Sequence, residues 1–204
     1  MKKISSVILL IISYSALQAQ AQVGLKGGFN MSSFVASYET EINYSTKTNF
    51  NAGIIVSLPM GSGLSLQPEM YYSGEGADIE VDNVHGVYNF QMLNVPILLK
   101  YTAPFHLFAE TGPQAGFLLG ATIKEGEFPS TDVKSQTKSP NYSWAFGVGY
   151  QLPAGLGLDI RYNLGLTDIA KSNNISYNDA TVKSNVFQIG IYFLFQNPVP
   201  ANKN

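Results

Sequence analysis

Residues 156–166 alternate strictly between two kinds of side chain. Every even position carries leucine, isoleucine or tyrosine, whereas the odd positions carry glycine, asparagine, Asp159 and Arg161. Successive side chains of a β-strand point to opposite faces, so this period of two predicts a strand with one apolar and one polar face. The polar face is rich in glycine, which suits the crowded inside of a narrow barrel. The segment therefore indicates a barrel with an apolar outer surface.

Similar alternation occurs in eight segments of the chain. Each segment contains at least the roughly 9 to 11 residues that a tilted strand needs to cross a bilayer. The segments cover residues 22–34, 48–58, 64–74, 87–101, 106–120, 141–152, 156–167 and 184–196. We therefore predict an all-β fold, namely an eight-stranded antiparallel up-and-down transmembrane β-barrel.

The connections between these segments alternate in length. The short ones consist of turn-forming residues and cover 59–63, 102–105 and 153–155. The long ones cover 35–47, 75–86, 121–140 and 168–183. Outer-membrane barrels have short periplasmic turns and long extracellular loops. The sequence thus predicts four long extracellular loops, with both ends of the barrel domain on the periplasmic side.

The first 21 residues have the features of a cleaved signal peptide. Lys2 and Lys3 precede an apolar stretch over 4–17, and Ala19-Gln20-Ala21 is a small-residue cleavage site. The apolar stretch is shorter than the roughly 20 residues that a membrane-spanning helix needs. We expect a signal peptide at 1–21, a barrel at 22–196 and a short polar tail at 197–204.

The composition contains little charge. Charged residues make up 13% of the chain, compared with about 25% in soluble domains. Without the two signal-peptide lysines, ten basic residues face fourteen acidic ones and form no basic cluster, so nucleic acid is not an expected partner. The chain has no cysteine, which excludes disulfides and thiol catalysis. Outer-membrane lipid is the expected surrounding.

Charged residues recur on the inward side of the predicted strands. Three are basic and three are acidic, and they are Lys26, Glu69, Lys100, Glu110, Asp159 and Arg161. The interior of an eight-stranded barrel is just wide enough to be filled by side chains, and buried charges are tolerated when they are paired. We predict an interior charge lattice in which Asp159 and Arg161 pair with opposite charges, including Lys26 or Glu69 across the lumen. An ion or proton path is the functional alternative.

Five motifs follow one another along the predicted barrel. They are VGLKGGFN at 23–30, LQPEMYYS at 66–73, VPILLKY at 95–101, GPQAG at 112–116 and GLGLDIRYNLGL at 155–166. In this order they resemble the PorT-like outer membrane β-barrel family of Gram-negative bacteria. The resemblance implies an eight-stranded barrel in the outer membrane and does not imply a reaction.

The last segment contains a pattern with its own meaning. Residues 188–195 read QIGIYFLF, and this looks like the signal that the barrel assembly machinery recognises. A polar residue is followed two positions later by glycine, and apolar residues stand three and five positions after that glycine. We therefore predict that Gln188, Gly190, Phe193 and Phe195 form an assembly signal, with the machinery as a partner during biogenesis.

Residues that could support catalysis or metal binding are sparse. The two histidines, His85 and His106, fall at opposite rims of the predicted barrel, so they cannot share a metal ion. His85 with Asp82 and a nearby serine is the best hydrolytic candidate, but a triad is recognised by geometry. Asp78, Glu80 and Asp82 lack the spacing of a calcium-binding loop. We predict no catalytic, cofactor or metal residues, and hence no enzyme.

Three classes of function are compatible with this sequence. The favoured one is an outer-membrane protein of structural or interaction type, whose loops serve adhesion, anchoring or docking of an unidentified envelope component. The second is a narrow or gated pore that assists transport. The third is a soluble, lipocalin-like barrel with the facing reversed, which would expose about ten glycines and crowd large aromatic side chains into one small cavity.

Overall fold

The computed structural model describes residues 21–36, 43–81, 84–126, 128–169 and 182–195. The tail predicted at 197–204 and all but the last residue of the predicted signal peptide lie outside these ranges, so both stay predictions. Within the described ranges, no helix is long and apolar enough to cross a membrane.

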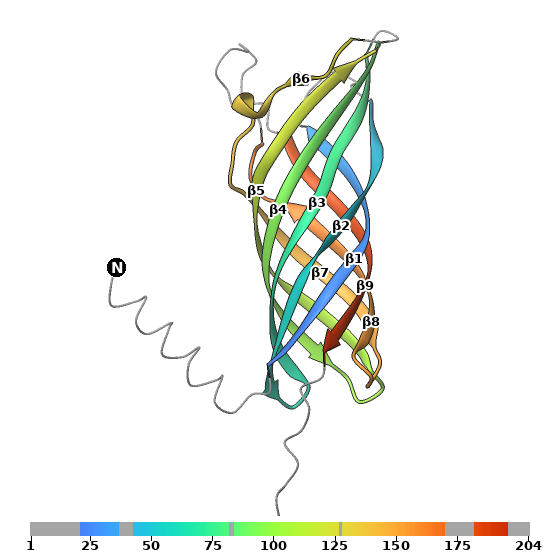
Figure 1. Ribbon diagram of the computed structural model, residues 1–204, viewed down its shortest axis with the longest axis vertical. Helices are drawn as coiled ribbons and strands as arrows, with labels where there is room; N and C mark the ends of the chain where they lie inside the picture. The colour runs from blue at the N-terminus through green and yellow to red at the C-terminus, as the bar shows by residue number, and fades with distance from the viewer. Residues whose placement is uncertain (1–20, 37–42, 82–83, 127, 170–181, 196–204) are drawn as a thin grey trace, which may run out of the picture.

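Long antiparallel strands form a closed wall (Figure 1). They are β1 (Gln22–Ala36), β2 (Asn43–Gly61), β3 (Leu64–Val81), β4 (Val84–Thr102), β5 (Leu107–Glu125), β7 (Asn141–Gln151), β8 (Leu156–Gly165) and β9 (Val182–Phe195). The short strand β6 (Thr131–Asp132) pairs only with β5, and the 3-10 helix η1 (Lys134–Gln136) follows it. The predicted eight-stranded barrel is therefore confirmed over the described residues.

The ring closes where the first strand meets the last. β1 pairs with β9 from Val23 opposite Phe195 to Ala36 opposite Val182. Pairing of β4 with β5 continues the wall on the other side. Each of the eight strands thus has a partner on both sides, and this satisfies the backbone hydrogen bonds that lipid cannot satisfy.

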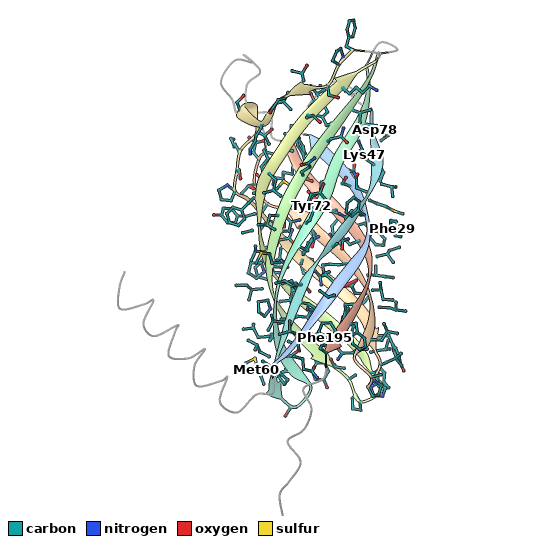
Figure 2. The ribbon with its side chains drawn as sticks, in the orientation of Figure 1. Phe29, Lys47, Met60, Tyr72, Asp78 and Phe195 are labelled. Atoms are coloured by element: carbon teal, nitrogen blue, oxygen red, sulfur yellow. The ribbon has the colours of Figure 1, made fainter. Side chains whose placement is uncertain are left out.

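The side chains alternate between the lumen and the outside as predicted. In β8 every second residue is buried, and Leu158 is 57% exposed whereas Arg161 is 1% exposed. Phe29 and Phe195, both labelled in Figure 2, are 65% and 48% exposed. Large apolar side chains cover the outside of all eight strands, and such a continuous surface requires an apolar environment. The reversed facing of a lipocalin-like barrel is therefore wrong.

The strands are longer at the loop end than predicted. The expected long connection at 75–86 is wrong, because β3 continues to Val81 and β4 begins at Val84. Figure 1 shows β3, β4 and β5 rising above the other strands. Above the apolar band, an outward side chain meets water and need not be apolar. The alternation of apolar and polar residues therefore ends there, although the backbone of the two strands remains paired. Ala77 opposite Tyr88 is one such pair.

The opposite end consists of tight turns. The turn between β2 and β3 places Gly61, Ser62 and Gly63 at positive φ angles of 94°, 53° and 80°, a conformation that glycine adopts readily. Between β7 and β8, the Gly155 N–H donates to the Leu152 carbonyl at 3.0 Å. The predicted short turns are therefore confirmed.

Candidate functional site

Six charged side chains meet in the middle of the lumen, and we call them the central lattice. They are Lys26 from β1, Glu69 from β3, Lys100 from β4, Glu110 from β5, and Asp159 and Arg161 from β8. Their exposed fractions lie between 1% for Arg161 and 7% for Lys26. The strand alternation thus brings all six predicted residues to the barrel interior.

Arg161 of β8 connects a carboxylate of the opposite wall, Glu69 of β3, with Glu110 of β5, which is only two strands away. Its Nη1 and Nη2 donate to Oε2 and Oε1 of Glu69 at 2.8 and 2.9 Å. Its Nε and Nη2 both donate to Oε1 of Glu110, at 2.9 and 2.5 Å. Asp159 lies further away, with its Oδ2 3.7 Å from Nη2. Paired, charge-assisted hydrogen bonds of this kind fix both distance and orientation.

Glu69 is also held by a second cation. The Nζ atom of Lys26 donates to its Oε2 at 2.8 Å and lies 3.9 Å from Oδ2 of Asp159. Gln67 donates from Nε2 to Oε1 of Glu69 at 2.9 Å and to Oε2 of Glu110 at 3.2 Å. The carboxylates of the central lattice are therefore joined by one amide as well as by the cations.

Lys100 is held mainly by neutral groups. Its Nζ atom donates to the Tyr192 hydroxyl at 2.6 Å, to Oε1 of Gln151 at 2.8 Å and to Oε1 of Gln67 at 3.3 Å. The same atom lies 3.8 Å from the ring centre of Phe108 and 4.7 Å from that of Tyr192, within the range of cation–π attraction. Among the described residues, no carboxylate lies within ion-pair distance of Lys100.

Glycine provides the space in which the lattice forms. Gly147 in β7 is the register partner of Glu110 on one side and of Arg161 on the other. A Cβ atom at Gly147 would lie 2.8 Å from Cγ of Glu110. The two long side chains therefore meet over a strand that has no side chain at this point, a use of strand glycine that permits close approach.

An amide layer lies above the central lattice, and the sequence analysis missed it. Asn30 donates from Nδ2 to the Ser73 hydroxyl at 2.8 Å, while its Oδ1 accepts from Asn51 at 2.6 Å and from Gln188 at 3.0 Å. Tyr71 is fully buried nearby. The signal was present, because all these residues occupy inward positions of the alternating segments.

The four residues predicted as an assembly signal lie on both faces of β9. Gln188 and Gly190 face the lumen, and Gly190 is opposite Gly28 of β1. Phe193 and Phe195 point outward with exposed fractions of 42% and 48%, and their ring centres are 5.5 Å apart. In the folded barrel, these residues do not converge on one site.

The predicted alternatives for catalysis and cation binding lie partly beyond the described residues. Asp82 lies outside them, and so do the side chains of Glu80 and His85. Among the described residues, no three His, Cys, Asp or Glu side chains come close enough to hold a metal ion.

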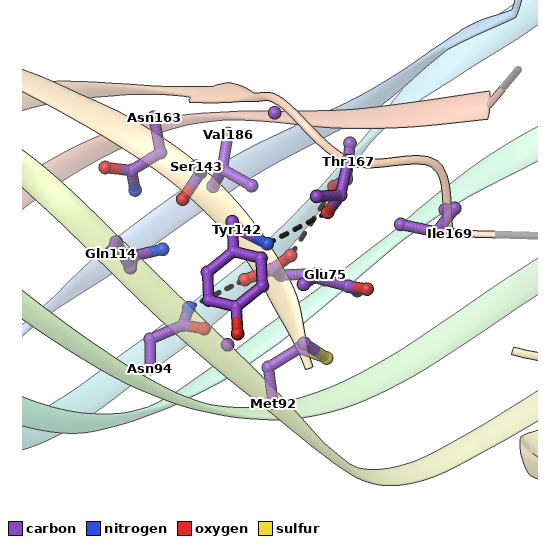
Figure 3. Close-up of a pocket in the computed structure, with 14 residues that line it drawn as sticks. Glu75, Met92, Asn94, Gln114, Tyr142, Ser143, Asn163, Thr167, Ile169 and Val186 are labelled. Carbon is purple, nitrogen blue, oxygen red and sulfur yellow. Dashed lines mark hydrogen bonds between the residues drawn. The ribbon is translucent and has the colours of Figure 1, made fainter. Parts of the chain in front are cut away.

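A cavity of about 30 Å³, lined by polar and apolar side chains, occupies the lumen toward the loop end, and we call it the upper chamber (Figure 3). Glu75 lines it and is 8% exposed. The sequence analysis missed Glu75 because it assigned this position to a loop, whereas β3 continues through it. Met92 and Ile169 line the chamber and also belong to an apolar cluster at this end of the barrel.

This geometry defines a class of protein. A closed antiparallel barrel with an apolar outside and a filled polar inside has the architecture of a transmembrane β-barrel. The family model described as outer membrane protein beta-barrel domain matches residues 18–171. The chain therefore belongs to this family, and the protein is located in the outer membrane of a Gram-negative bacterium, with lipid around its outer face.

A comparison with solved structures finds outer-membrane proteins, and the fold likeness is supported by Neisserial surface protein A. Neisserial surface protein A matches with a TM-score of 0.54 and 12% identity, over 86% of this chain and 99% of that chain. Ail of Yersinia pestis has a TM-score of 0.45 and 13% identity, over 86% and 99% of the two chains. OprG of Pseudomonas aeruginosa has a TM-score of 0.47 and 12% identity, over 88% and 98%. In a comparison with curated protein sequences, none matches the chain.

Proposed function

We propose that this protein is a closed outer-membrane barrel of structural or interaction type, which acts through the surface it presents at the loop end. The observation that carries this proposal is the filled lumen at the central lattice. Arg161 contacts Glu69 and Glu110 at 2.5 to 2.9 Å, and the contact with Glu69 crosses the lumen from β8 to the opposite strand β3. The five motifs that resemble the PorT-like family support the proposal that this chain is related to it.

Apolar layers strengthen the closure. Ile55, Phe108, Tyr192 and Leu194 form a buried cluster beside Lys100, toward the turn end. At the loop end, a second buried cluster contains Ala77, Phe90, Met92, Leu118, Ala121, Val133 and Ile169. Because an eight-stranded barrel has no spare internal width, the lattice and these clusters together support a barrier to solutes.

Conductance distinguishes this proposal from a pore. Purified protein inserted into planar lipid bilayers should give little stable conductance, similar to that of a bilayer treated with protein-free detergent. Reproducible large channels from the monomer would contradict the closed barrel and favour the alternative, a narrow or gated pore in transport.

We further propose that the projecting hairpin of β3 and β4 takes part in anchoring, adhesion or docking to an envelope component. Its strands continue beyond the apolar band and rise above the neighbouring wall (Figure 1). Crosslinking in cells followed by purification should recover a specific partner with the intact chain. Replacing residues 79–86 with a two-residue turn should remove that partner while the barrel still folds. Recovery of the same partner with the shortened hairpin would assign docking to another surface.

The β9 pattern supports a proposed role in assembly. Gln188, Gly190, Phe193 and Phe195 fit the expected signal, and β9 must pair with β1 to close the barrel. Phe195→Ser should leave the precursor exported but poorly inserted, as measured by the compact band that a folded barrel gives on an unheated gel. Ile189→Val, another outward position of β9, is the matched control. Normal amounts of the compact band with Phe195→Ser would show that this residue is an ordinary strand residue.

A further inference from the structure

The upper chamber contains the carboxylate of Glu75, and one of its oxygen atoms could accept a further contact from a ligand. Oε1 of Glu75 accepts hydrogen bonds from Ser73 and from Asn94, both at 2.9 Å. Oε2 has only a long contact of 3.5 Å with the Ser184 hydroxyl. Figure 3 shows Glu75 and Asn94 at the chamber, joined by one of these bonds. One oxygen of this buried carboxylate is therefore weakly satisfied.

The charge balance of the lumen leaves Glu75 without compensation. In the central lattice, three cations balance three anions. Among the described residues, no lysine or arginine lies within ion-pair distance of Glu75. An isolated ionised carboxylate away from water is costly and needs a counter-charge or a proton. A cation in the chamber would supply that counter-charge.

Asn163 provides an independent observation. It is 2% exposed and lines the same chamber, yet neither its Oδ1 nor its Nδ2 has a hydrogen-bond partner. Asn141, also in the chamber lining, has a buried Oδ1 without a partner. Buried amide groups are nearly always paired with protein or with an ordered molecule. These two side chains therefore indicate that something polar occupies the chamber.

We propose that the upper chamber binds one small monovalent cation of the Na⁺ class, together with water. Carboxylate, amide and hydroxyl oxygens are ligands for hard cations. One carboxylate gives a neutral site with a monovalent ion, whereas calcium sites usually contain several carboxylates. A volume of about 30 Å³ is enough for an ion and a water molecule, since one water needs roughly 10 to 15 Å³ by this measure. Organic ligands are too large.

The test compares sodium with a cation that cannot enter. The full chain is purified in detergent, and the temperature that converts half of the compact gel band is measured in NaCl and in choline chloride at equal ionic strength. A bound ion stabilises the folded state by mass action, so Na⁺ should raise this temperature by about 2 to 4 °C in a protein of this size. The shift should disappear in Glu75→Gln and persist in Asp78→Asn, which removes an acidic group that does not line the chamber.

The outcomes decide between an ion and its alternatives. Equal temperatures in both salts would overturn the proposal and indicate a chamber with water or a protonated Glu75. A sodium shift that survives Glu75→Gln would also overturn it, because the ion would then bind elsewhere. If Glu75→Gln does not fold, Asn163→Leu replaces it and should likewise reduce the shift. Broadening of the ²³Na NMR signal by the intact protein, beyond that by Asn163→Leu, gives a direct measure of binding.

Discussion

The central lattice and the upper chamber are two buried polar regions of one lumen, and they differ in how completely their groups are paired. In the lattice, Arg161 uses three nitrogen atoms to bind two carboxylates at 2.5 to 2.9 Å. In the chamber, Asn163 is nearly as buried, and its side chain has no hydrogen bond. Depth of burial therefore does not explain the difference.

Strand geometry does explain it. Around Arg161, the glycine at position 147 lets a long side chain from β5 meet one from β8. Around Asn163, the register partners are Ala145 and Val186, which offer no hydrogen-bonding side chain. A fully paired polar network resists change, whereas an incompletely paired one has room for a ligand. The first region is therefore suited to closing the barrel and the second to binding.

The largest effect is expected from breaking the central lattice. Arg161→Leu leaves Glu69 without its bidentate partner and Glu110 without a cation in ion-pair contact. Removing one member of a buried ion pair typically costs about 3 to 5 kcal/mol. The free energy of unfolding can be measured by urea titration in lipid vesicles, with the fluorescence of Trp144, the single tryptophan of the chain, as the signal.

Leu158→Ile is the matched control for this experiment. Leu158 lies in the same strand and points outward, so a swap of similar volume should cost less than about 1.5 kcal/mol. If Arg161→Leu costs no more than Leu158→Ile, the lattice does not stabilise the barrel, and the contrast between the two lumen regions loses its energetic basis.

A smaller effect should follow from filling the space that the lattice uses. In Gly147→Ala, the new methyl group would meet Cγ and Oε1 of Glu110 at 2.8 Å. Glu110 cannot move away without losing its bonds to Arg161, so the change should cost about 1 to 3 kcal/mol. Gly27→Ala is the control, because a Cβ there meets only the Asn51 carbonyl oxygen at 3.6 Å. Equal costs at both glycines would show that the lattice can relax around an added methyl group.

The fold could be predicted from sequence because the two faces of each strand meet different environments inside the membrane. The period of two in 156–166 identified both β8 and the facing of its side chains. The same reasoning failed at Glu75, because the outward positions near it are no longer apolar, as exposed Gln91 illustrates. Strand pairing itself continues there, with Glu75 opposite Phe90.

The pairing of the interior groups could be predicted only in part. Alternation predicts which residues face the lumen. The partner across the lumen also depends on the position of each strand along the barrel axis, which is set by the register of strand pairing around the barrel. Lys100 was expected in a lattice of ion pairs, and its closest contact is instead the Tyr192 hydroxyl, 92 residues away in sequence. The side chain of Asn163 lacks a hydrogen-bond partner because of the residues that both neighbouring strands place beside it. A pattern within one strand could not reveal this.

The smallest loss of stability is expected in the upper chamber. The same substitution, asparagine to leucine, is made at a site with hydrogen bonds and at a site without them, and the two costs are compared. Asn30→Leu removes the amide that bonds Ser73, Asn51 and Gln188, and leaving such partners unpaired should cost about 1 to 3 kcal/mol. Asn163→Leu removes an amide with no hydrogen bond, so in choline chloride its cost should stay within about 0.5 kcal/mol.

Both asparagines are almost fully buried, with exposed fractions of 0% and 2%, and leucine has the same branching as asparagine with a larger volume. Loss of burial therefore cannot account for a difference between the two variants in urea titrations. If Asn163→Leu costs as much as Asn30→Leu without sodium, its amide has a partner within the protein, and the two regions of the lumen would be equally satisfied. A small cost in choline chloride that grows in NaCl would instead assign the stabilising role of Asn163 to the ion it helps to hold.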